Sequence, residues 1–513
     1  SFTKIMQTNT NSEKIILGVS GGHHDGAMCI LKGGKIIVAL EVERLSKKKK
    51  ERLHDNSFSL LLEYVLDAAE IKWEDIDYVA SGCCPEYPYL NDVELSRDWL
   101  IEGLNLQSKP IYTVPHHLSH ASAAYFTSPF TDAVFLTLDG SDGNVEYFFH
   151  NSLVGWGTDN FIKGDRMIPC GTSIYYQRVC EYLGLGDALH KVGTLMGLAS
   201  YGTILRSYVD LSPEHETTNL IEENFSTAAN IAATAQKVLE ERVLNSIKSD
   251  MCSPGWNRDP YKSTNLCLGG GIFYNCPTNS RILKETKFKN IHHFPSCGDS
   301  GIGIGAALYV AHTILDQPRH QYKPHEICYL GKNYELKKEI DYEYIARRIS
   351  EGAVVAWMNG RSEFGPRALG NRSLLADPRN QYNKDRLNHD IKQREWYRPF
   401  APIVLEECYQ DWFDFDIPSP FMLYTAQVKQ PEKVPAITHV DGSARFQTVT
   451  EESNTHIYKL IKEFEKITNV PMLINTSLNG KGQPILETPE DGVEFFNNNP
   501  VDMAVIHGEI MEK

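Results

Sequence analysis

The sequence has few cysteines and none of them in a C-x-x-C pair. Its 513 residues contain 11 cysteines, an odd number without paired spacing. Such a set is neither a disulfide framework nor a structural zinc finger. The chain also lacks the run of about 18–20 apolar residues that a transmembrane helix needs. Its first residues lack the apolar core of a signal peptide. These absences predict a soluble, cytoplasmic protein without a membrane partner.

Positive charge is also scarce overall. The chain has 51 Lys and Arg against 66 Asp and Glu, a net charge of −15. Nonspecific nucleic-acid binding needs many cations to neutralise phosphates, so we expect no nucleic-acid partner. A local basic pocket for a small phosphorylated ligand remains compatible with this balance. The hydrophobic fraction of 42% is ordinary for a globular enzyme.

The order of apolar segments and turns indicates an α/β protein with an internal duplication. Strand–turn–strand units occur at residues 17–40, around a Lys-Gly-Gly hairpin signal, and at 134–149, where the second strand is expected at 145–149. An amphipathic helix is predicted over 228–247. Residues 316–329 lose periodicity and hold two prolines, which is typical of a linker. A second domain is therefore expected in the C-terminal part of the chain.

Two histidines and two aspartates form a candidate metal site. His116 and His120 are four residues apart, so on a helix they share one face. Asp139 ends an apolar strand, and Asp299 precedes a helix. A set of two His and two Asp ligands suits iron, manganese or zinc. A structural role for the histidines and a helix cap for Asp299 are equally compatible with the spacing.

Two glycine-rich loops carry further candidates. His24 and Asp25 lie in a loop directly after the first strand. A histidine there can act as a general base, with Asp25 orienting it, because imidazole titrates near neutrality. Gly269–Gly271 follow another strand, so their N–H groups suit a nucleotide. The alternative for the His24 loop is a polar turn without a catalytic role. The alternative for Gly269–Gly271 is tight packing alone.

Basic residues gather in the last third of this acidic chain. Guanidinium groups match phosphate and carboxylate oxygens in a bidentate manner, which favours an anion cradle over a solvated basic face. The strand ending at Ile474–Asn479 adds small hydrogen-bonding groups. The basic residues are Arg361, Arg367, Arg372, Lys392, Arg394, Arg398 and Arg445.

Several segments in fixed order together resemble the NodU/CmcH-type O-carbamoyltransferases. They include LGVSGGHHDGA, HHLSHASAAY, LTLDG, GGGIFYN, EFGPRALGNRSLLADPR and INTSLNGKGQPI. The resemblance implies a duplicated actin-like (ASKHA) domain over residues 1–325, followed by a YrdC-like α/β domain over 326–513. It implies ATP-dependent transfer of a carbamoyl group from carbamoyl phosphate, through a carbamoyl-adenylate, to a hydroxyl of a small molecule. The acceptor would be a secondary metabolite or a sugar-like alcohol.

The resemblance also assigns residues. His24 would be the base, and His116, His120, Asp139 and Asp299 would hold a divalent or trivalent metal, typically iron, while Mg²⁺ could accompany ATP. The implied nucleotide contacts are Lys49, Gly270, Gly271 and Asn275. The implied carbamoyl phosphate contacts are Arg367, Lys392, Arg398, Arg445, Asn475 and Ser477. The sequence departs from the family at Lys50, where a histidine is expected, and at Thr194, where a lysine is expected.

Two other functions share these features. One is a nucleotide-binding scaffold of the same fold without turnover, favoured by the two departures. The other is a carbamoylating enzyme of a maturation pathway. The net charge of −15 disfavours tRNA as its partner, and the absence of C-x-x-C pairs argues against a zinc-finger-bearing hydrogenase maturation enzyme.

Overall fold

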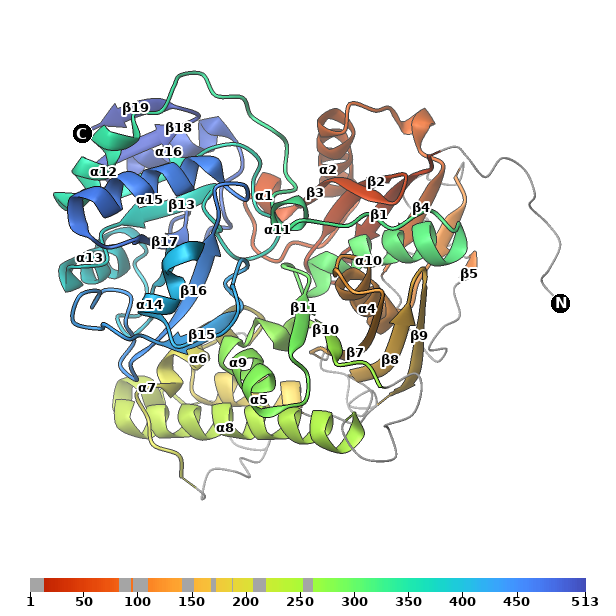
Figure 1. Cartoon of the computed structure of the whole chain (residues 1–513), viewed down its shortest axis with the longest axis horizontal. Coiled ribbons are helices and arrows are strands. Elements are labelled where there is room, and N and C mark those ends of the chain that lie inside the picture. Colours follow the sequence, from red (N-terminus) through yellow and green to blue (C-terminus); the bar gives the residue numbers. More distant parts are fainter. Residues whose placement is uncertain are drawn as a thin grey trace.

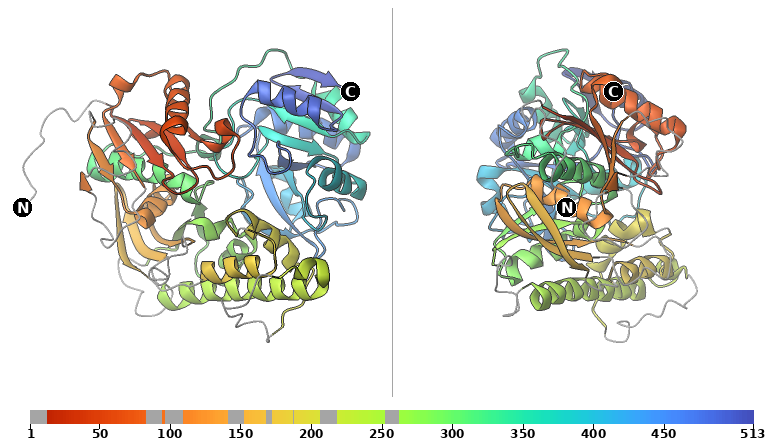
Figure 2. Two further views of the ribbon diagram at one scale, coloured as in Figure 1. Left: turned by 180° about the vertical axis from the view of Figure 1, so that it is seen from behind. Right: turned by 90° about the vertical axis from the view of Figure 1, so that its right-hand side faces the viewer.

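The protein is described here by a computed structural model. It covers residues 13–82, 94–95, 109–140, 152–167, 172–186, 188–205, 218–251 and 262–513. The N-terminal sheets and the C-terminal domain lie side by side (Figure 1). The view from behind in Figure 2 shows the same arrangement.

The first sheet begins with the expected hairpin. Its turn residues Gly33 and Gly34 have φ values of 56° and 80°, the left-handed geometry of a type I′ turn. The first three strands pair antiparallel, and the first strand then pairs parallel with the fourth. The order across the sheet is β3 (Lys35–Glu41), β2 (Ala27–Lys32), β1 (Ile15–Ser20), β4 (Tyr78–Ser81), β6 (Ile111–Thr113) and β5 (Glu94–Leu95).

The second sheet repeats this connectivity. Its first three strands again form an antiparallel meander, and its last two strands are added parallel on the other side of the first, as β4 and β6 are in the first sheet. This repetition confirms the predicted duplication of the first domain. The expected strand at 145–149 lies outside the described residues. The order is β11 (Asn290–His293), β10 (Asn265–Gly269), β7 (Asp132–Leu138), β8 (Ser152–Thr158) and β9 (Phe161–Met167).

Two helices pack between the halves of this duplicated domain. α4 (His116–Phe126) and α10 (Ile302–Tyr309) are almost wholly buried. A Cβ on Gly305 would lie 1.8 Å from the carbonyl oxygen of Ser119, so only glycine permits this close approach. The amphipathic helix α2 (Asp55–Ala68) covers the outer face of the first sheet with Phe58, Leu61 and Val65.

A layer of helices runs beneath both domains in the view of Figure 1. The expected helix at 228–247 is present as the longer α8 (Phe225–Asp250), which buries a row of alanines. His439 Nε2 of the second domain lies 3.0 Å from the carbonyl oxygen of Gly197 in this layer. The other helices are α5 (Thr172–Tyr182), α6 (Ala188–Ala199) and α7 (Leu220–Glu223). α9 (Cys276–Glu285) packs against α8 and against β15 (Tyr424–Gln427) of the second domain.

The second domain is α/β, as predicted. Its central strands are buried on both faces, which requires helices on each side. The sheet order is β15 (Tyr424–Gln427), β16 (Ser443–Val449), β14 (Ala401–Leu405), β17 (Met472–Ser477), β13 (Arg372–Ala376), β12 (Val355–Met358), β18 (Met503–Ile506) and β19 (Glu509–Glu512). The helices are α12 (Tyr342–Ser350), α13 (Gln381–Arg386), α14 (Tyr409–Trp412), α15 (Thr455–Thr468) and α16 (Pro489–Asn498).

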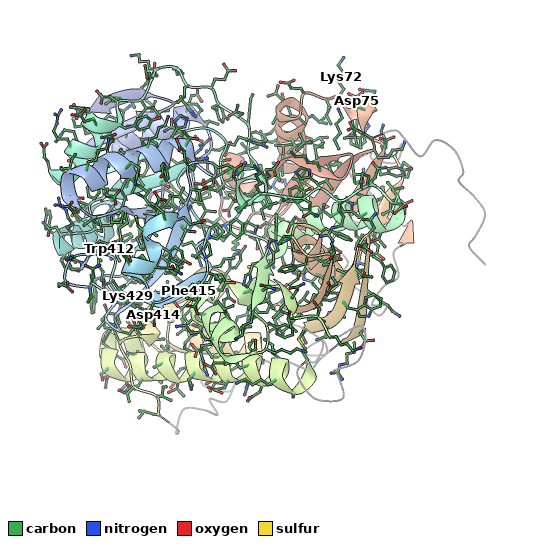
Figure 3. The ribbon with its side chains drawn as sticks, viewed as in Figure 1. Lys72, Asp75, Trp412, Asp414, Phe415 and Lys429 are labelled. Carbon is green, nitrogen blue, oxygen red and sulfur yellow. The ribbon has the colours of Figure 1, made fainter. Side chains whose placement is uncertain are left out.

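The β15 end of this sheet is closed by residues labelled in Figure 3. The N–H of Asp414 donates to the carbonyl of Gln427 (2.9 Å), and the N–H of Lys429 donates to the carbonyl of Trp412 (2.8 Å). The ring of Phe415 packs 5.1 Å from that of Tyr424. These contacts cover an edge strand that would otherwise be unpaired.

Main-chain hydrogen bonds connect the two domains at Leu330, directly after the expected linker at 316–329. After α11 (Pro324–Cys328), the carbonyl of Leu330 accepts from Ala39 of β3, while its N–H donates to Ser362 of the second domain. The domain boundary at residue 325 stays a prediction. Over the described ranges, no helix is both long and apolar enough to cross a membrane.

Candidate metal centre and anion cradle

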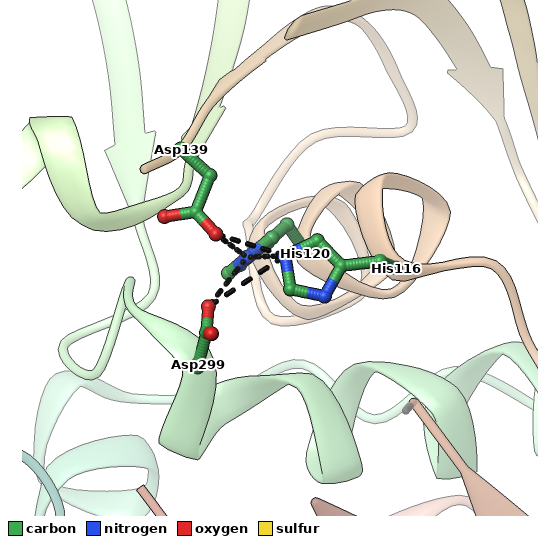
Figure 4. A group of neighbouring side chains, drawn as sticks. All are labelled: His116, His120, Asp139 and Asp299. Carbon is green, nitrogen blue, oxygen red and sulfur yellow. Dashed lines mark hydrogen bonds and ion pairs between the residues drawn. The ribbon is translucent and has the colours of Figure 1, made fainter. Parts of the chain in front are cut away.

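Four side chains from three separate segments meet at one point (Figure 4). Asp139 Oδ2 lies 2.8 Å from His116 Nε2 and 3.3 Å from His120 Nε2. Asp299 Oδ1 lies 3.6 Å and 3.3 Å from the same nitrogens. One donor atom from each residue falls within 4.8 Å of all the others. The structure thus brings together the four predicted ligands.

The local structure explains this convergence. α4 begins at His116, so its first turn places His120 directly behind His116 on one face. Asp139 is carried past the end of β7, and Asp299 opens the short helix before α10. Asp299 is the first helical residue, after Gly298 at the cap position. Asp299 therefore does not have the alternative helix-cap role. Its side chain faces the histidines instead.

The electrostatics of this cluster suit a cation. Burial raises the pKa of Asp139, but His116 and His120 lower it by more. The net pKa lies well below its usual value, so the carboxylate stays ionised. Burial lowers the pKa of His120, but Asp139 and Asp299 together raise it to about 9. Asp299 Oδ1 lies 3.3 Å from His120 Nε2, yet among the described residues no donor meets this buried oxygen with hydrogen-bond geometry. Two imidazoles and two carboxylates, with one oxygen unsatisfied, fit a first-row transition metal.

The glycine turn after β10 supports this cluster. Gly270 has φ 103°, and a Cβ there would lie 2.0 Å from the carbonyl oxygen of Leu138. The turn directs the N–H of Gly271 to Asp139 Oδ1, at 2.9 Å. This bond fixes Asp139 Oδ1, while Asp139 Oδ2 faces the histidines. Gly270 and Gly271 thus position Asp139, and their contact with a nucleotide stays a prediction.

Asn275 also has a structural role. Its Oδ1 caps α9 by accepting from the N–H of Thr278 (3.2 Å), and its Nδ2 donates to Gln236 of α8 (3.0 Å). Asn275 therefore joins the helical layer to α9. The sequence did not indicate Gln236, because this contact links residues that are 39 positions apart.

His24 lies beside the metal cluster. Its Nε2 is 3.7 Å from Asp299 Oδ2, and its Nδ1 is 2.8 Å from Asp25 Oδ2. Lys50 Nζ lies 2.9 Å from the Asp25 carboxylate. Burial raises the pKa of Asp25, but His24 and Lys50 lower it below its usual value. Asp25 is thus an ionised anchor for the imidazole, and Lys50 fills a position where the family resemblance implied histidine.

Cations of the first and second domains face each other next to this loop. Burial lowers the pKa of Lys49, and Arg398, Lys191 and Lys50 lower it further, although Glu43 opposes them. Arg398 belongs to the second domain, so Lys49 lies where the two domains meet. The predicted phosphate-contacting lysine is therefore close to the predicted carbamoyl phosphate residues.

Three arginines of the second domain, Arg367, Arg398 and Arg445, form a group that we call the anion cradle. Burial lowers the pKa of Arg445 to about 9, and Arg367 and Arg398 contribute to this by repulsion. Arg398 is 3.6 Å from Glu395. Within the described part of the chain, Arg367 and Arg445 have no carboxylate at ion-pair distance, and the buried Nε of each lacks a hydrogen-bond acceptor. Positive charge gathered in this way is typical of a site for a polyanion.

Lys392 lies near this cradle, since burial lowers its pKa and the charges of Arg394, Lys49 and Arg398 lower it further. Lys392 Nζ donates to Ser477 Oγ and to the carbonyl of Asn479, each at 3.1 Å. Asn475 Nδ2 donates to the carbonyl of Ala368 (3.1 Å). These bonds tie Lys392, Ser477 and Asn475 into the protein itself. Asn479 belongs to the predicted hydrogen-bonding segment at 474–479, but it was not among the implied carbamoyl phosphate contacts.

Two arginines of the predicted basic group have other surroundings. Arg372 is fully buried and donates to the carbonyls of Glu487, Asn359, Gly360 and Asn371. Arg361 donates to the carbonyls of Gly331, Ile37 and Leu330. Main-chain oxygens therefore occupy donors of both guanidinium groups, which distinguishes them from Arg367 and Arg445.

Comparisons with known proteins cover nearly the whole chain. A family model described as carbamoyltransferase N-terminus matches residues 15–87, 88–212 and 209–308, and one described as carbamoyltransferase C-terminus matches 346–513. Nodulation protein NolNO of Sinorhizobium fredii is 31% identical, over 96% of this chain and 79% of that protein. The 3'-hydroxymethylcephem-O-carbamoyltransferase of Streptomyces clavuligerus is 28% identical, over 94% of this chain and 96% of the enzyme. A crystal structure of T. kodakarensis HypF is 14% identical, with a TM-score of 0.35, over 60% of this chain and 48% of that one.

Proposed function

The chain belongs to the carbamoyltransferase family, and from that premise we propose an ATP-dependent O-carbamoyltransferase that acts on a small-molecule alcohol. The donor is carbamoyl phosphate, and the activated intermediate is carbamoyl-adenylate. The observation that carries the proposal is the anion cradle, whose three partly buried guanidinium groups have one carboxylate, Glu395, beside Arg398 and none beside Arg367 and Arg445 within the described residues, next to a loop holding His24. Both substrates are polyanions, which such a cradle attracts.

The first half-reaction belongs to the second domain. Water first releases phosphate from carbamoyl phosphate. An oxygen of the resulting carbamate then attacks the α-phosphorus of ATP and displaces pyrophosphate. Arg367, Arg398 and Arg445 bind the phosphate oxygens and stabilise the negative charge that develops on them. Lys49 extends this positive field from the first domain, while Lys392, Asn475 and Ser477 lie near the cradle.

The second half-reaction belongs to the first domain. The acceptor oxygen attacks the carbamoyl carbon, His24 Nε2 takes the hydroxyl proton, and AMP leaves. The contact of His24 Nδ1 with the Asp25 carboxylate favours the tautomer in which Nδ1 carries the proton and Nε2 is the basic nitrogen. A metal held by His116, His120, Asp139 and Asp299, for which iron fits the ligands, would act as a Lewis acid. The acceptor class is a secondary metabolite or a sugar-like alcohol.

Mass spectrometry tests the reaction directly. The protein is incubated with ATP, carbamoyl phosphate and candidate alcohols, and pyrophosphate is measured in parallel. We expect an alcohol to gain one carbamoyl group, and pyrophosphate to depend on carbamoyl phosphate. A protein that releases no pyrophosphate with both substrates present, and shows no exchange between pyrophosphate and ATP, would be a scaffold instead.

His24→Asn separates the half-reactions. We expect this substitution to abolish transfer while pyrophosphate release continues, because His24 is assigned to the second step alone. His389→Asn is the control, since His389 is a 91% exposed histidine of the second domain. Equal loss of both half-reactions in His24→Asn would contradict the assigned role.

A further inference from the structure

The loop that carries Arg367 is closed by its own carboxylate. Glu363 Oε1 accepts hydrogen bonds from the N–H groups of Leu369 (2.8 Å), Asn371 (2.7 Å) and Arg372 (3.1 Å). Residues 363–372, which we call the cradle loop, are therefore folded around the fully buried Glu363. Arg367 lies near the middle of this loop, so its place depends on how the loop is held.

Two side chains of the first domain hold this loop. Arg44 Nη2 donates to the carbonyls of Glu363 and Gly365, each at 2.8 Å. The Glu41 carboxylate accepts from the N–H of Gly365. Gly365 has φ 115°, a conformation that other residues rarely adopt. Arg44 and Glu41 thus bind the N–H and the carbonyl of Gly365, together with the carbonyl of Glu363, in the other domain.

The contacts of Arg44 and Glu41 with the cradle loop are buried. Arg44 is 0% exposed and Glu41 5%. Over the described residues, Arg44 Nε and Nη1 and Glu41 Oε2 have no hydrogen-bond partner, so the pair is incompletely satisfied. A buried ion pair of this kind is commonly no more stable than an apolar pair of the same size. Stability alone therefore does not account for these charges.

The same short segment also reaches the transfer centre. Glu41 ends β3, Arg44 lies in α1 (Glu43–Ser46), and Lys50 follows a few residues later. Glu43 Oε2 accepts from the N–H of Lys50 (2.8 Å), which fixes the segment's far end. Lys50 in turn contacts Asp25, the partner of His24. Residues 41–50 thus touch the cradle loop at one end and the general-base loop at the other.

We propose that Arg44 and Glu41 are positioning residues, which hold the cradle loop of the second domain in register with the His24 loop of the first. The identity of the anion in the cradle rests on the proposed function, but the mechanical link does not. Through this link, Arg367 is placed for phosphate binding by side chains that never touch the substrate. Misplacement by about 1 Å can cost on the order of 100-fold in rate, so such a link matters for turnover.

Arg44→Lys is the main test, because it keeps the positive charge and removes the fork that spans two carbonyls. Lys47→Met is the matched control: Lys47 lies in the same segment, and its Nζ contacts Asp491 of the second domain and the carbonyl of Arg44, neither of which belongs to the cradle loop. Amide hydrogen exchange reports on the loop, with β14 of the same domain as internal reference. Calorimetry with inorganic phosphate reports on the cradle, and steady-state kinetics separate KM from kcat.

We expect Arg44→Lys to speed exchange at residues 363–372 and leave β14 unchanged. The Kd for inorganic phosphate and the KM for carbamoyl phosphate should each rise about tenfold, while the KM for the acceptor stays within about twofold. Lys47→Met should match the wild type in all four measurements. Wild-type loop exchange together with wild-type phosphate affinity in folded Arg44→Lys would overturn the proposal.

Two further arms keep the result interpretable. If Arg44→Lys does not fold, Glu41→Gln replaces it, since glutamine has equal size but lacks the negative charge that faces Arg44. Unchanged loop exchange and phosphate affinity in Glu41→Gln would then overturn the proposal. If no carbamoyl transfer occurs with any alcohol, the proposed function fails. Loosened exchange and weakened phosphate binding would still support the link.

Discussion

The metal cluster and the anion cradle balance their charges in opposite ways. In the metal cluster, carboxylates and imidazoles alternate within hydrogen-bond distance, so each ionised group has a partner of opposite sign. In the cradle, burial lowers the pKa of Arg445 and of Arg398, and the neighbouring charge of Arg367 lowers both further, while only Arg398 lies near a carboxylate of the described chain. The ion pairs of the metal cluster therefore hold its side chains in place before any ligand binds.

This difference indicates what each site binds. A cluster that already pairs cation and anion can exchange its shared protons for a metal ion, since imidazole and carboxylate are both ligands once deprotonated. A cradle of unbalanced guanidinium groups gains most from an incoming polyanion. The two sites therefore differ in how ligand binding relates to stability, and substitutions should affect them in opposite directions.

The largest effect is expected from Asp139→Asn. This change removes the carboxylate that contacts both histidines, so bound metal should fall close to zero and transfer by more than about 100-fold. Metal content by mass spectrometry and the carbamoylation assay measure the two effects. Asp132→Asn, at the exposed start of the same strand, is the control. Full metal content in Asp139→Asn would show that the four side chains are a hydrogen-bond cluster without a metal.

Arg445→Met is expected to weaken ligand binding while it raises the stability of the protein. The cradle loses one of three cations, so the Kd for inorganic phosphate should rise about 10- to 100-fold. The melting temperature should rise at the same time, because a buried and unbalanced charge is removed. Calorimetry and thermal unfolding measure these effects, with exposed Arg347→Met of the same domain as control. A lower melting temperature with unchanged phosphate affinity would mean that Arg445 is structural.

The sequence indicated the metal cluster and the cradle to different degrees, for a physical reason. The spacing of His116 and His120 defines one helix face, because helical geometry is local. Asp139 and Asp299 could be added only because they end a strand and open a helix. The duplicated sheets were also predictable, since alternating apolar segments and glycine turns are local signals.

Side-chain direction in the second domain was not predictable in this way. Arg367 and Arg372 lie five residues apart in one motif, yet the first belongs to the cradle and the second is enclosed by carbonyl groups. Likewise Gly271 and Asn275 serve Asp139 and the helical layer, which are distant in sequence. Spacing does not determine such contacts, because they depend on how the domains pack.

Glu41→Gln tests the contact between the two sites by pH. Burial raises the pKa of Glu41 to about 7, although Arg44 opposes this, while Glu43 adds to it. An acid with a raised folded-state pKa stabilises the fold at low pH, and this contribution is lost as pH rises toward 7. Glutamine does not titrate, so the free energy of unfolding of the variant should gain on the wild type by about 2 kcal/mol between pH 5 and 7.

Chemical unfolding across that pH range measures this difference. Glu70→Gln is the control, since Glu70 is exposed and its carboxylate has none of these surroundings. Parallel pH profiles for Glu41→Gln and the wild type would mean that Glu41 keeps an ordinary pKa through a full ion pair with Arg44. The contact between the domains would then resemble the balanced metal cluster rather than the cradle.

The smallest effect is expected from Gly271→Ala, which tests whether the glycine turn serves the metal cluster. A Cβ there would lie 3.1 Å from Asp139 Oδ1, so the carboxylate has to shift by a few tenths of an ångström. Metal affinity should fall only about two- to fivefold, because the N–H that holds Asp139 is retained. Gly193→Ala is the control, since a Cβ at this helical position meets no atom of the described chain within 4 Å. A loss of ATP affinity with unchanged metal affinity would reverse this assignment: the turn would then face the nucleotide, and Asp139 would be held in place by the histidines alone.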